Sequence, residues 1–305
     1  MKTLETSQSR RTFIGISAAL AASAMSPRIA LTAPPSKPNS KINGVQIGTI
    51  TYSYRSLPSD AESLLKYITQ CGISTIELMG NPVEQFAGAP TRNRRNNKDL
   101  LNWRLSTSME KFEELRKMYT EAGVDIHVVK FGDIGNPDMP DAQIEYYFNV
   151  AKALGAKGIT RELSEKAAKR LGPLADKHQI VIGFHNHTQI RPTTYDGDFL
   201  SYGKHLGINL DVGHYVAGTN ESPIPFIEKH HDRILSLHVK DRRINQGSNM
   251  PFGQGDTPIA LLLQYMKRHN LTFPADIELE YKVPKDSDAV KEVIKCVNFC
   301  NRCLA

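Results

Sequence analysis

The chain has 305 residues, and its 38 basic and 32 acidic side chains give a formal net charge of +6 at pH 7. A balance this close to even provides no single-sign field, so we expect no nucleic-acid partner. The four cysteines lack the pattern of a disulfide framework. Cys296, Cys300 and Cys303 share one face of a predicted C-terminal helix, and we interpret them as buried or half-buried helix residues rather than cluster ligands.

The first 33 residues resemble a twin-arginine export signal. Ser9–Ile14 matches such a signal almost position by position, and an alanine-rich apolar run follows it. This run is too short to span a bilayer comfortably, which disfavours an uncleaved anchor; a disordered tail is the other alternative. Removal of the signal takes four basic residues and one acidic residue from the totals of 38 and 32 and leaves a net charge of +3. We therefore expect a periplasmic protein with no membrane partner after signal removal.

Residues 34–41 are predicted to form a linker, and residues 42–305 alternate short apolar runs with amphipathic segments. In chain order, strands are predicted at 45–53, 74–80, 124–132, 156–163, 180–187, 206–214, 234–241 and 275–281. Helices are predicted at 60–72, 109–123, 141–155, 164–179, 257–270 and 288–303.

This alternation predicts one domain, a single (β/α)₈ TIM barrel over residues 42–305. A doubly wound open sheet is the alternative. That fold usually has a glycine-rich phosphate-binding turn after its first strand, whereas here the first strand ends in the sequence TYSYR at 51–55.

Four distinctive segments lie at the ends of the last four predicted strands: FHNH at 184–187, LDVGH at 210–214, LHVKD at 237–241 and IELEY at 277–281. Catalytic groups of barrels occupy this edge. We expect His185, Asp211, His238 and Glu280 to bind one divalent ion, with Glu278 as the alternative to Glu280 because both glutamates face the interior. Structural salt bridges are the other interpretation of the two glutamates. Two imidazoles and two carboxylates suit Mn, Co, Zn or Fe, and Mg is kept as a further option.

Other polar residues are expected beside this ion. His187 shares a strand face with His185 and is expected to contact the substrate. His214 can hydrogen-bond a substrate hydroxyl, and Lys240 can polarise a substrate oxygen, although Lys240 and Asp241 could also form a simple surface pair.

Glu162, at the end of the fourth strand, is a candidate general base, and Glu280 and a histidine beside the ion are the alternatives. Glu162 could equally stabilise the start of the following helix. Glu77 and Lys130 are weaker strand-end candidates. The long polar segment 81–103 is either a solvated loop or a lid in which Trp103 stacks on a sugar.

These motifs resemble the xylose isomerase-like barrel superfamily, in particular its sugar phosphate isomerase/epimerase-type members. The resemblance covers residues 42–305. It implies that Asp211, His238 and Glu280 are metal ligands and that His214 and Lys240 contact the substrate. One position departs from the pattern: the epimerases have a glutamate where this chain has His185, which breaks their pair of acid/base glutamates.

Some members with this HNH pattern resemble enzymes of the 3-keto-glycoside pathway. We therefore expect a metal-dependent enzyme that enolises an unphosphorylated keto-sugar, and a 3-keto-glycoside lyase ahead of a sugar isomerase or epimerase. More distant alternatives are a metal-dependent phosphodiesterase or endonuclease of the same barrel and a non-catalytic sugar-binding protein. The expected partner is a small-molecule carbohydrate, and a homo-oligomer is left open.

Overall fold

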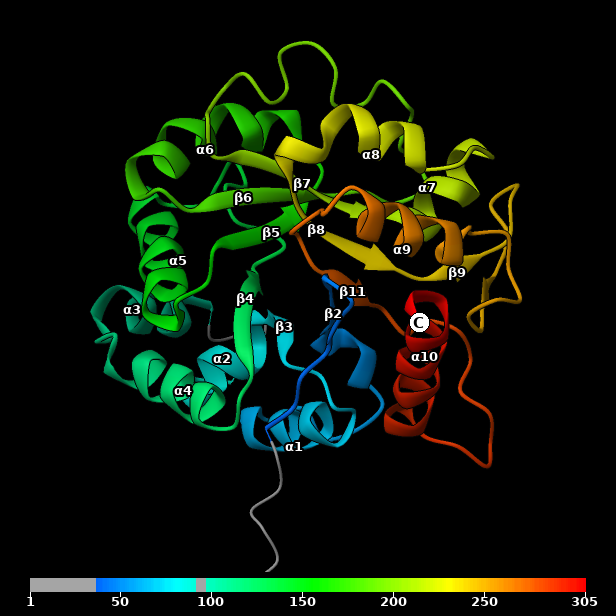
Figure 1. Ribbon diagram of the computed structural model, residues 1–305. Helices are drawn as coiled ribbons and strands as arrows, with labels where there is room; N and C mark the ends of the chain where they lie inside the picture. Colours follow the sequence, from blue (N-terminus) through cyan, green and yellow to red (C-terminus); the bar gives the residue numbers. More distant parts are fainter. Residues whose placement is uncertain (1–36, 92–96) are drawn as a thin grey trace, which may run out of the picture. The chain divides into compact units, whose positions relative to one another are not determined.

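The structure is a computed structural model that describes residues 37–91 and 97–305. The predicted export signal, residues 34–36 of the predicted linker and residues 92–96 of the long polar segment lie outside the described residues. Lys37–Ala305 forms one compact unit in which eight parallel strands close into a barrel (Figure 1). The prediction of a single (β/α)₈ barrel is confirmed.

Each barrel strand pairs with its neighbours in parallel, and the pairing of β2 with β3 closes the ring. The short strand β1 (Lys41–Ile42) adds to β2 in antiparallel fashion, and β9 (Asp241–Arg242) pairs with β10 (Asn249–Met250) outside the barrel. The barrel strands are β2 (Val45–Ile50), β3 (Thr75–Met79), β4 (Asp125–Lys130), β5 (Gly158–Glu162), β6 (Val181–His185), β7 (Leu206–Asp211), β8 (Ile234–Val239) and β11 (Ala275–Ile277).

Helices surround the barrel (Figure 1). Side chains of Asp60, Ser164 and Asp288 cap three of them by accepting a hydrogen bond from a backbone N–H of the first turn. The helices of the described part of the chain are α1 (Ala61–Gln70), α2 (Gly80–Phe86), α3 (Asn97–Ser106), α4 (Glu110–Glu121), α5 (Asp141–Leu154), α6 (Glu165–His178), α7 (Val212–Thr219), α8 (Ile224–His230), α9 (Ile259–Arg268) and α10 (Ala289–Leu304).

Four of these helices were not predicted: α2, α3, α7 and α8. The segment 81–103, where we expected a solvated loop or a lid, contains most of α2 and of α3. Pro82 is compatible with α2 because it lies in the first turn, where its missing N–H breaks no helical bond. The predicted strand 206–214 ends at Asp211, whose side chain accepts a hydrogen bond from the backbone N–H of His214 at 2.7 Å and thereby starts α7.

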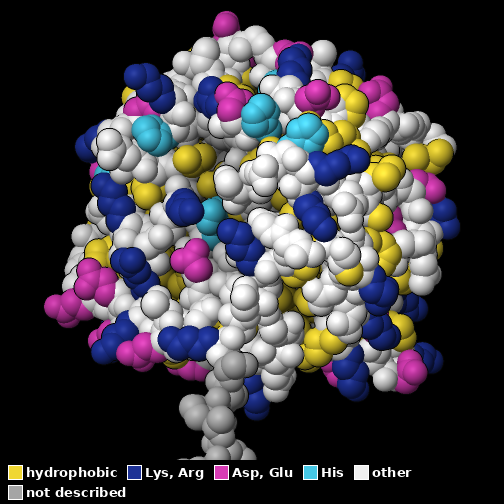
Figure 2. Space-filling view, in the orientation of Figure 1, with side chains coloured by type: hydrophobic (Ala, Val, Ile, Leu, Met, Phe, Trp, Pro, Cys, Tyr) yellow, Lys and Arg dark blue, Asp and Glu magenta, His cyan; other side chains and the backbone are white. Residues whose placement is uncertain are grey.

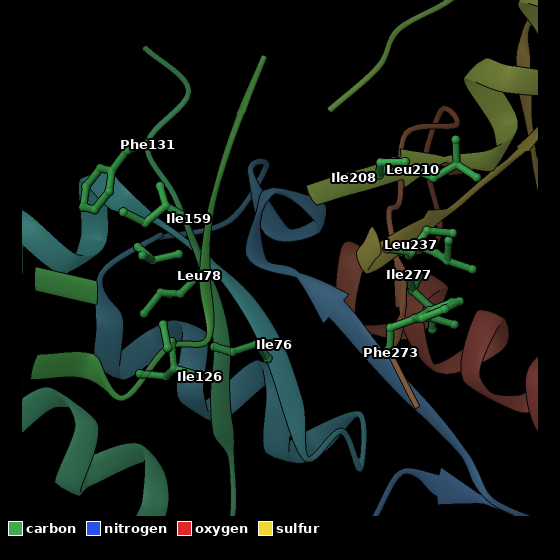
Figure 3. Packing of buried hydrophobic residues seen from close by; sticks show 14 of the residues in the cluster. Ile76, Leu78, Ile126, Phe131, Ile159, Ile208, Leu210, Leu237, Phe273 and Ile277 are labelled. Atoms are coloured by element: carbon green, nitrogen blue, oxygen red, sulfur yellow. The ribbon is translucent and has the colours of Figure 1, made fainter. Parts of the chain in front are cut away.

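Alternate side chains of the strands form an apolar layer in the described structure, and Figure 3 shows two parts of it. One part comes from the β3–β5 side and the other from the β7, β8 and β11 side. The labelled residues are Ile76, Leu78, Ile126, Phe131 and Ile159 in the first part, and Ile208, Leu210, Leu237, Phe273 and Ile277 in the second.

Several side chains between these apolar residues point into the barrel interior and are polar, and Leu235 of β8 lies there as well, beside Gly158 and Gly183. Glu77 of β3 accepts hydrogen bonds from Thr160 of β5 at 2.6 Å and from Asn209 of β7 at 3.2 Å. Since β3 is adjacent only to β2 and β4 in the sheet, these contacts run through the interior. The interior of the barrel is therefore filled by side chains, and hydrogen bonds link side chains of strands that are not neighbours in the sheet.

At the surface, basic and acidic side chains are interspersed over the face shown in Figure 2. Within residues 37–91 and 97–305, none of the helices has the length and apolar character needed to cross a bilayer. The four cysteines are free thiols; Cys71, Cys296 and Cys300 are buried and Cys303 is half-buried, in agreement with the interpretation from the sequence.

Candidate metal centre

Four side chains converge where β6, β7, β8 and β11 end. They are His185, Asp211, His238 and Glu278, and one ligand atom from each lies within 4.8 Å of the others. These strands are consecutive neighbours in the sheet, and Asp211 pairs directly with His238 in the register of β7 and β8. All four residues are buried. The donor set of two imidazoles and two carboxylates could hold a divalent transition metal ion.

Glu278, the alternative in our prediction, takes the place we expected for Glu280. Strand β11 ends at Ile277, and the backbone N–H of Glu278 still donates to the carbonyl of Val239 at 3.0 Å, so the sheet holds Glu278 in place. Glu280 lies beyond the strand, is partly exposed, and does not belong to the cluster of four. The alternation of strand side chains was a poor guide at Glu280 because the strand had already ended.

His238 is held between two carboxylates. Its Nε2 lies 2.9 Å from Glu77 Oε2, and its Nδ1 lies 3.1 Å from Glu278 Oε2. Burial would lower the pKa of His238, but Glu77 and Glu278 outweigh it and raise the pKa to about 10. Burial would raise the pKa of Glu77, yet His238 keeps it below its ordinary value. Glu77 therefore orients His238 through the nitrogen that faces away from Glu278, as a carboxylate behind a ligating histidine does.

His185 has one nitrogen free for a ligand. The amide nitrogen of Asn209 donates to Ser236 at 2.7 Å and to Glu77, so Asn209 Oδ1 faces His185 Nδ1 at 2.7 Å and accepts its proton. Burial, with Lys130 and His238 nearby, lowers the pKa of His185 well below its ordinary value. The ring is thus neutral, protonated at Nδ1, and has its lone pair on Nε2.

Lys240 balances the acidic side of the cluster. Its Nζ lies 2.9 Å from Asp211 Oδ2, 2.8 Å from Glu278 Oε2 and 2.5 Å from Glu280 Oε2. Burial would lower the pKa of Lys240, but Asp211 and Glu278 raise it, so Lys240 is an ammonium. Asp211 Oδ2 is buried and has no partner in hydrogen-bonding geometry. Its contact with the Lys240 ammonium is an ion pair outside that geometry, so this oxygen can still serve as a metal ligand. Glu280 can retain the ammonium when Asp211 and Glu278 bind an ion.

A second group borders the cluster on the side of β5. His187 Nε2 lies 2.8 Å from Glu162 Oε2, and Lys130 Nζ lies 3.1 Å from Glu162 Oε1. Burial would raise the pKa of Glu162, but His187 and Lys130 lower it to about 2. The hydrogen bond to Glu162 raises the pKa of His187 above its ordinary value. The rings of His185 and His187 meet edge to face with centroids 5.0 Å apart, so the pair lies directly beside the candidate metal ligands.

His214 has a defined tautomer. Its Nδ1 lies 2.6 Å from Arg242 Nη1, and because a guanidinium can only donate, Nδ1 must accept. Burial and the neighbouring Lys240 lower the pKa of His214 to about 3. His214 is therefore neutral and carries its proton on Nε2. Its ring centroid lies 4.8 Å from that of His187, so this N–H donor lies beside the same cluster of side chains at the ends of the strands.

A family model described as "Xylose isomerase-like TIM barrel" matches residues 65–300. The chain belongs to the xylose isomerase-like TIM barrel family. No curated protein matches the chain. The solved structures below are less than 20% identical to it, so their likeness concerns the fold of this family.

One such structure is the probable 3-DHS dehydratase AsbF, involved in petrobactin synthesis in Bacillus anthracis, with a TM-score of 0.61, 14% identity, and coverage of 83% of this chain and 99% of that chain. Another is a sugar phosphate isomerase/epimerase from Parabacteroides distasonis, with a TM-score of 0.57, 18% identity, and coverage of 84% and 95%. A family member from Mycobacterium smegmatis, solved in complex with magnesium, has a TM-score of 0.58, 12% identity, and coverage of 85% and 96%.

In the present chain, two residues lie elsewhere than we expected from the sequence. Trp103 on α3 packs against Phe112 and Tyr146, with ring centroids 6.4 and 6.2 Å away, and is held by these helix contacts away from the four clustered residues. Its apolar surface is used to attach α3 to α4 and α5. Glu280 pairs with Lys240 instead of joining the four clustered residues.

Sequence reasoning ranked Glu77 low and missed Asn209 and Arg242. Both Glu77 and Asn209 are polar residues inside apolar strand runs, IEL and INL, and that interruption was the available signal. Arg242 follows LHVKD directly, but its contact with His214 joins β9 to α7 and depends on the tertiary structure.

Proposed function

We propose that this protein is a metal-dependent enzyme that enolises an unphosphorylated keto-sugar, and specifically a lyase that cleaves 3-keto-glycosides. The observation that carries the proposal is the buried group of His185, Asp211, His238 and Glu278 with the His187–Glu162 pair directly beside it. A divalent ion held by these four residues would act as a Lewis acid on the ketone oxygen and acidify the neighbouring C–H. The remaining steps depend on side chains that surround these four residues at the ends of the strands.

The His187–Glu162 pair is the proposed proton carrier. Glu162 accepts a hydrogen bond from one ring nitrogen, which orients the imidazole and makes it a stronger base. His187 would take the proton from C2, next to the ketone at C3. The C1–O bond then breaks as the C1–C2 double bond forms, and protonated His187 returns its proton to the leaving oxygen to give the free aglycone alcohol.

Two donors would orient the sugar during this step. His214 offers its Nε2 proton to a hydroxyl or ketone oxygen, because Arg242 occupies the other ring nitrogen. Lys240 offers a buried ammonium between Asp211 and Glu278. Glu280, which we also considered as a base, is committed to Lys240 at 2.5 Å and is better placed to hold that ammonium than to abstract a proton.

The test is aglycone release. Purified protein, stripped of metal and reloaded separately with Mn²⁺, Co²⁺, Zn²⁺, Fe²⁺ or Mg²⁺, is incubated with a 3-keto-glucoside, and the free alcohol is measured. We expect release that depends on the ion and stops with a chelator. The lyase assignment is wrong if the glycoside survives while its sugar ring is epimerised or isomerised.

Sugar isomerisation or epimerisation is the second candidate. It is supported by the similarity to a sugar phosphate isomerase/epimerase, while a dehydratase among the similar structures supports elimination. The two reactions share the first proton transfer and differ in the fate of the enolate. His185 favours elimination in our proposal, because a histidine in place of glutamate leaves only one carboxylate, Glu278, at the usual positions of the acid/base pair.

We also propose that the reaction takes place outside the cytoplasm. The support is the motif at Ser9–Ile14 and the apolar run that follows it. Fusion of residues 1–41 to a reporter that is active only after export would test this, with Arg10 and Arg11 changed to lysine as the control. Retention of the unaltered fusion in the cytoplasm would contradict the proposal.

A further inference from the structure

A cavity of about 300 Å³ lies at the mouth of the barrel, beside the ends of β3 and β4. Its volume is at the lower end of the roughly 300–1,000 Å³ that small-molecule sites occupy. None of the four candidate metal ligands lines it. The lining consists of Met79, Gly80, Asn81, Glu84, Arg104, Lys130, Phe131, Gly132, Asp133 and Tyr147.

The cavity is joined to the candidate metal centre through Lys130. This lysine lines the cavity, and its Nζ lies 3.1 Å from Glu162 Oε1. Gly132 provides a second point of contact, since a Cβ atom added there would lie 3.9 Å from the same Glu162 oxygen. Glu162 in turn contacts His187, which lies against His185. The order in space is therefore metal ligands, His187–Glu162, Lys130 and cavity.

The walls combine an aromatic pair with fixed polar groups. The rings of Phe131 and Tyr147 lie 4.3 Å apart, and Phe131 packs so closely over Gly80 that a side chain at position 80 would collide with the ring. Arg104 and Glu84 form a bidentate, buried ion pair at 2.7 and 2.8 Å. Asn81 is exposed at the rim. Rigid rings beside charged and amide groups suit a ligand with one apolar face and several hydroxyls, such as a sugar ring.

We propose that this cavity binds the leaving group of the substrate, a second sugar ring joined through the glycosidic oxygen; the inference rests on the proposed lyase function. In a 3-keto-glycoside the ketone at C3, the acidic C2–H and the C1–O bond follow one another. The metal ligands, the His187–Glu162 pair and Lys130 follow one another in the same order. If the two orders are aligned, the aglycone, which is bonded to the oxygen on C1, lies in the cavity. The Lys130 ammonium then lies where the departing oxygen gains negative charge.

A second cavity provides a matched control. It has about 340 Å³, lies beside the end of β11, and is lined by Ser53, Arg55, Ser56, Leu279, Glu280, Tyr281, Lys282 and Val283. Ser56 and Asn81 are both exposed polar residues that line one of these two cavities, so a tryptophan at either position obstructs that cavity and leaves the other of the two open. Asn81 also lines a neighbouring cavity of about 300 Å³ formed with residues of α2 and α3. Neither residue belongs to the proposed proton-transfer or metal-binding groups.

The test compares Asn81→Trp, Asn81→Ala and Ser56→Trp with the unaltered protein, all metal-loaded. The substrates are a 3-keto-disaccharide, the methyl 3-keto-glucoside and free 3-keto-glucose, for which exchange of the C2 proton in D₂O is followed. We expect Asn81→Trp to raise KM for the disaccharide about tenfold, equivalent to about 1.4 kcal/mol, without changing the other two substrates. Asn81→Ala should act in the same direction by a smaller factor, and Ser56→Trp should have no effect.

Two kinds of failure are distinguishable. If the unaltered protein exchanges no C2 proton and releases no alcohol from any of the three substrates, the proposed function is wrong and the leaving-group site is wrong with it. If exchange occurs but Asn81→Trp affects all substrates equally or none, only the leaving-group site is wrong. An effect of Ser56→Trp on the disaccharide alone would assign the second ring to the other cavity and overturn the inference.

Discussion

In β3 and β7 the two faces of the strand carry opposite kinds of residue, one position apart. Glu77 lies between Ile76 and Leu78, and Asn209 lies between Ile208 and Leu210. The apolar members pack in the layer shown in Figure 3, whereas the polar members meet across the interior. The same backbone therefore presents a hydrophobic layer that stabilises the fold and a polar layer that can perform chemistry.

The polar layer is tolerated because its members satisfy one another. Buried charges are costly unless they are paired and hydrogen-bonded, and here Glu77, His238, Glu278 and Lys240 form a continuous set of ion pairs. Asp276 is an exception in which both carboxylate oxygens are buried without a hydrogen-bond partner, and burial raises its pKa well above the ordinary value. Its side chain fits only because Gly48 lies opposite.

The largest expected effect is from the inward residue at the end of β7. Asp211→Asn removes the charge of a candidate metal ligand but keeps an oxygen for the α7 cap. We expect a loss of alcohol release of at least about 10³-fold, because the ion and its Lewis acidity are lost. Metal content after dialysis and kcat are the measurements. A variant that retains one ion and near-normal kcat would show that Asp211 is not a ligand.

Substitution of Leu210, the outward-facing neighbour of Asp211, should affect stability and leave metal binding intact. Leu210 is fully buried in the apolar layer, and Leu210→Ala is expected to lower the free energy of unfolding by about 2–5 kcal/mol while the protein still binds one ion. Urea denaturation and metal analysis test the two parts separately. Loss of the ion from folded Leu210→Ala would break the separation between the two faces.

Glu77→Gln tests the support behind His238. The amide cannot neutralise the imidazole or fix its tautomer as the carboxylate does, and we expect about 10–100-fold weaker metal binding. Calorimetric titration of metal into the stripped protein measures the effect. Thr160→Val, which removes another hydrogen bond to Glu77 without changing a charge, is the control and should have a smaller effect.

Metal binding should release a proton from His238. Its pKa in the metal-free protein is about 10, so the ion competes with a proton below that pH and its affinity should rise by up to about tenfold per pH unit. Because this pKa is raised from 6.5, the protonated histidine stabilises the metal-free fold fully below pH 6.5, and this stabilisation is lost as the pH rises through about 10. Titrations in buffers of different ionisation enthalpy, and the thermal midpoint of stripped protein against pH, test both signs.

The smallest effect is expected from Arg242→Met. Without the guanidinium, Nδ1 of His214 is free to carry the proton, and the Nε2–H donor is no longer enforced. We expect kcat to fall about tenfold with metal content unchanged. Arg242→Lys keeps a donor to the same nitrogen and should restore part of the rate; equal losses in both variants would favour a structural role of Arg242, which also donates to the carbonyl of Gly247 at 2.6 Å.

The sequence by itself determined the barrel and three of the four clustered residues. A chain that alternates apolar strands with amphipathic helices can adopt only a few folds. His185, Asp211 and His238 lie at the ends of strands that can be recognised from their hydrophobic runs. It also determined that a glutamate of IELEY faces the interior. These features follow from local periodicity, which neighbouring residues carry without reference to distant ones.

The tertiary structure decided the features that the periodicity of the sequence does not specify: where a strand ends, which tautomer a histidine has, and where an aromatic side chain packs. Glu278 rather than Glu280 joins the cluster because β11 stops at Ile277, and that end depends on pairing with β8 and β2. The tautomers of His185 and His214 depend on Asn209 and Arg242, which come from other elements. Trp103 lies in the packing of α3 because its aromatic partners on α4 and α5 are there. Each of these outcomes is set by contacts between residues far apart in the chain, and no local pattern encodes such contacts.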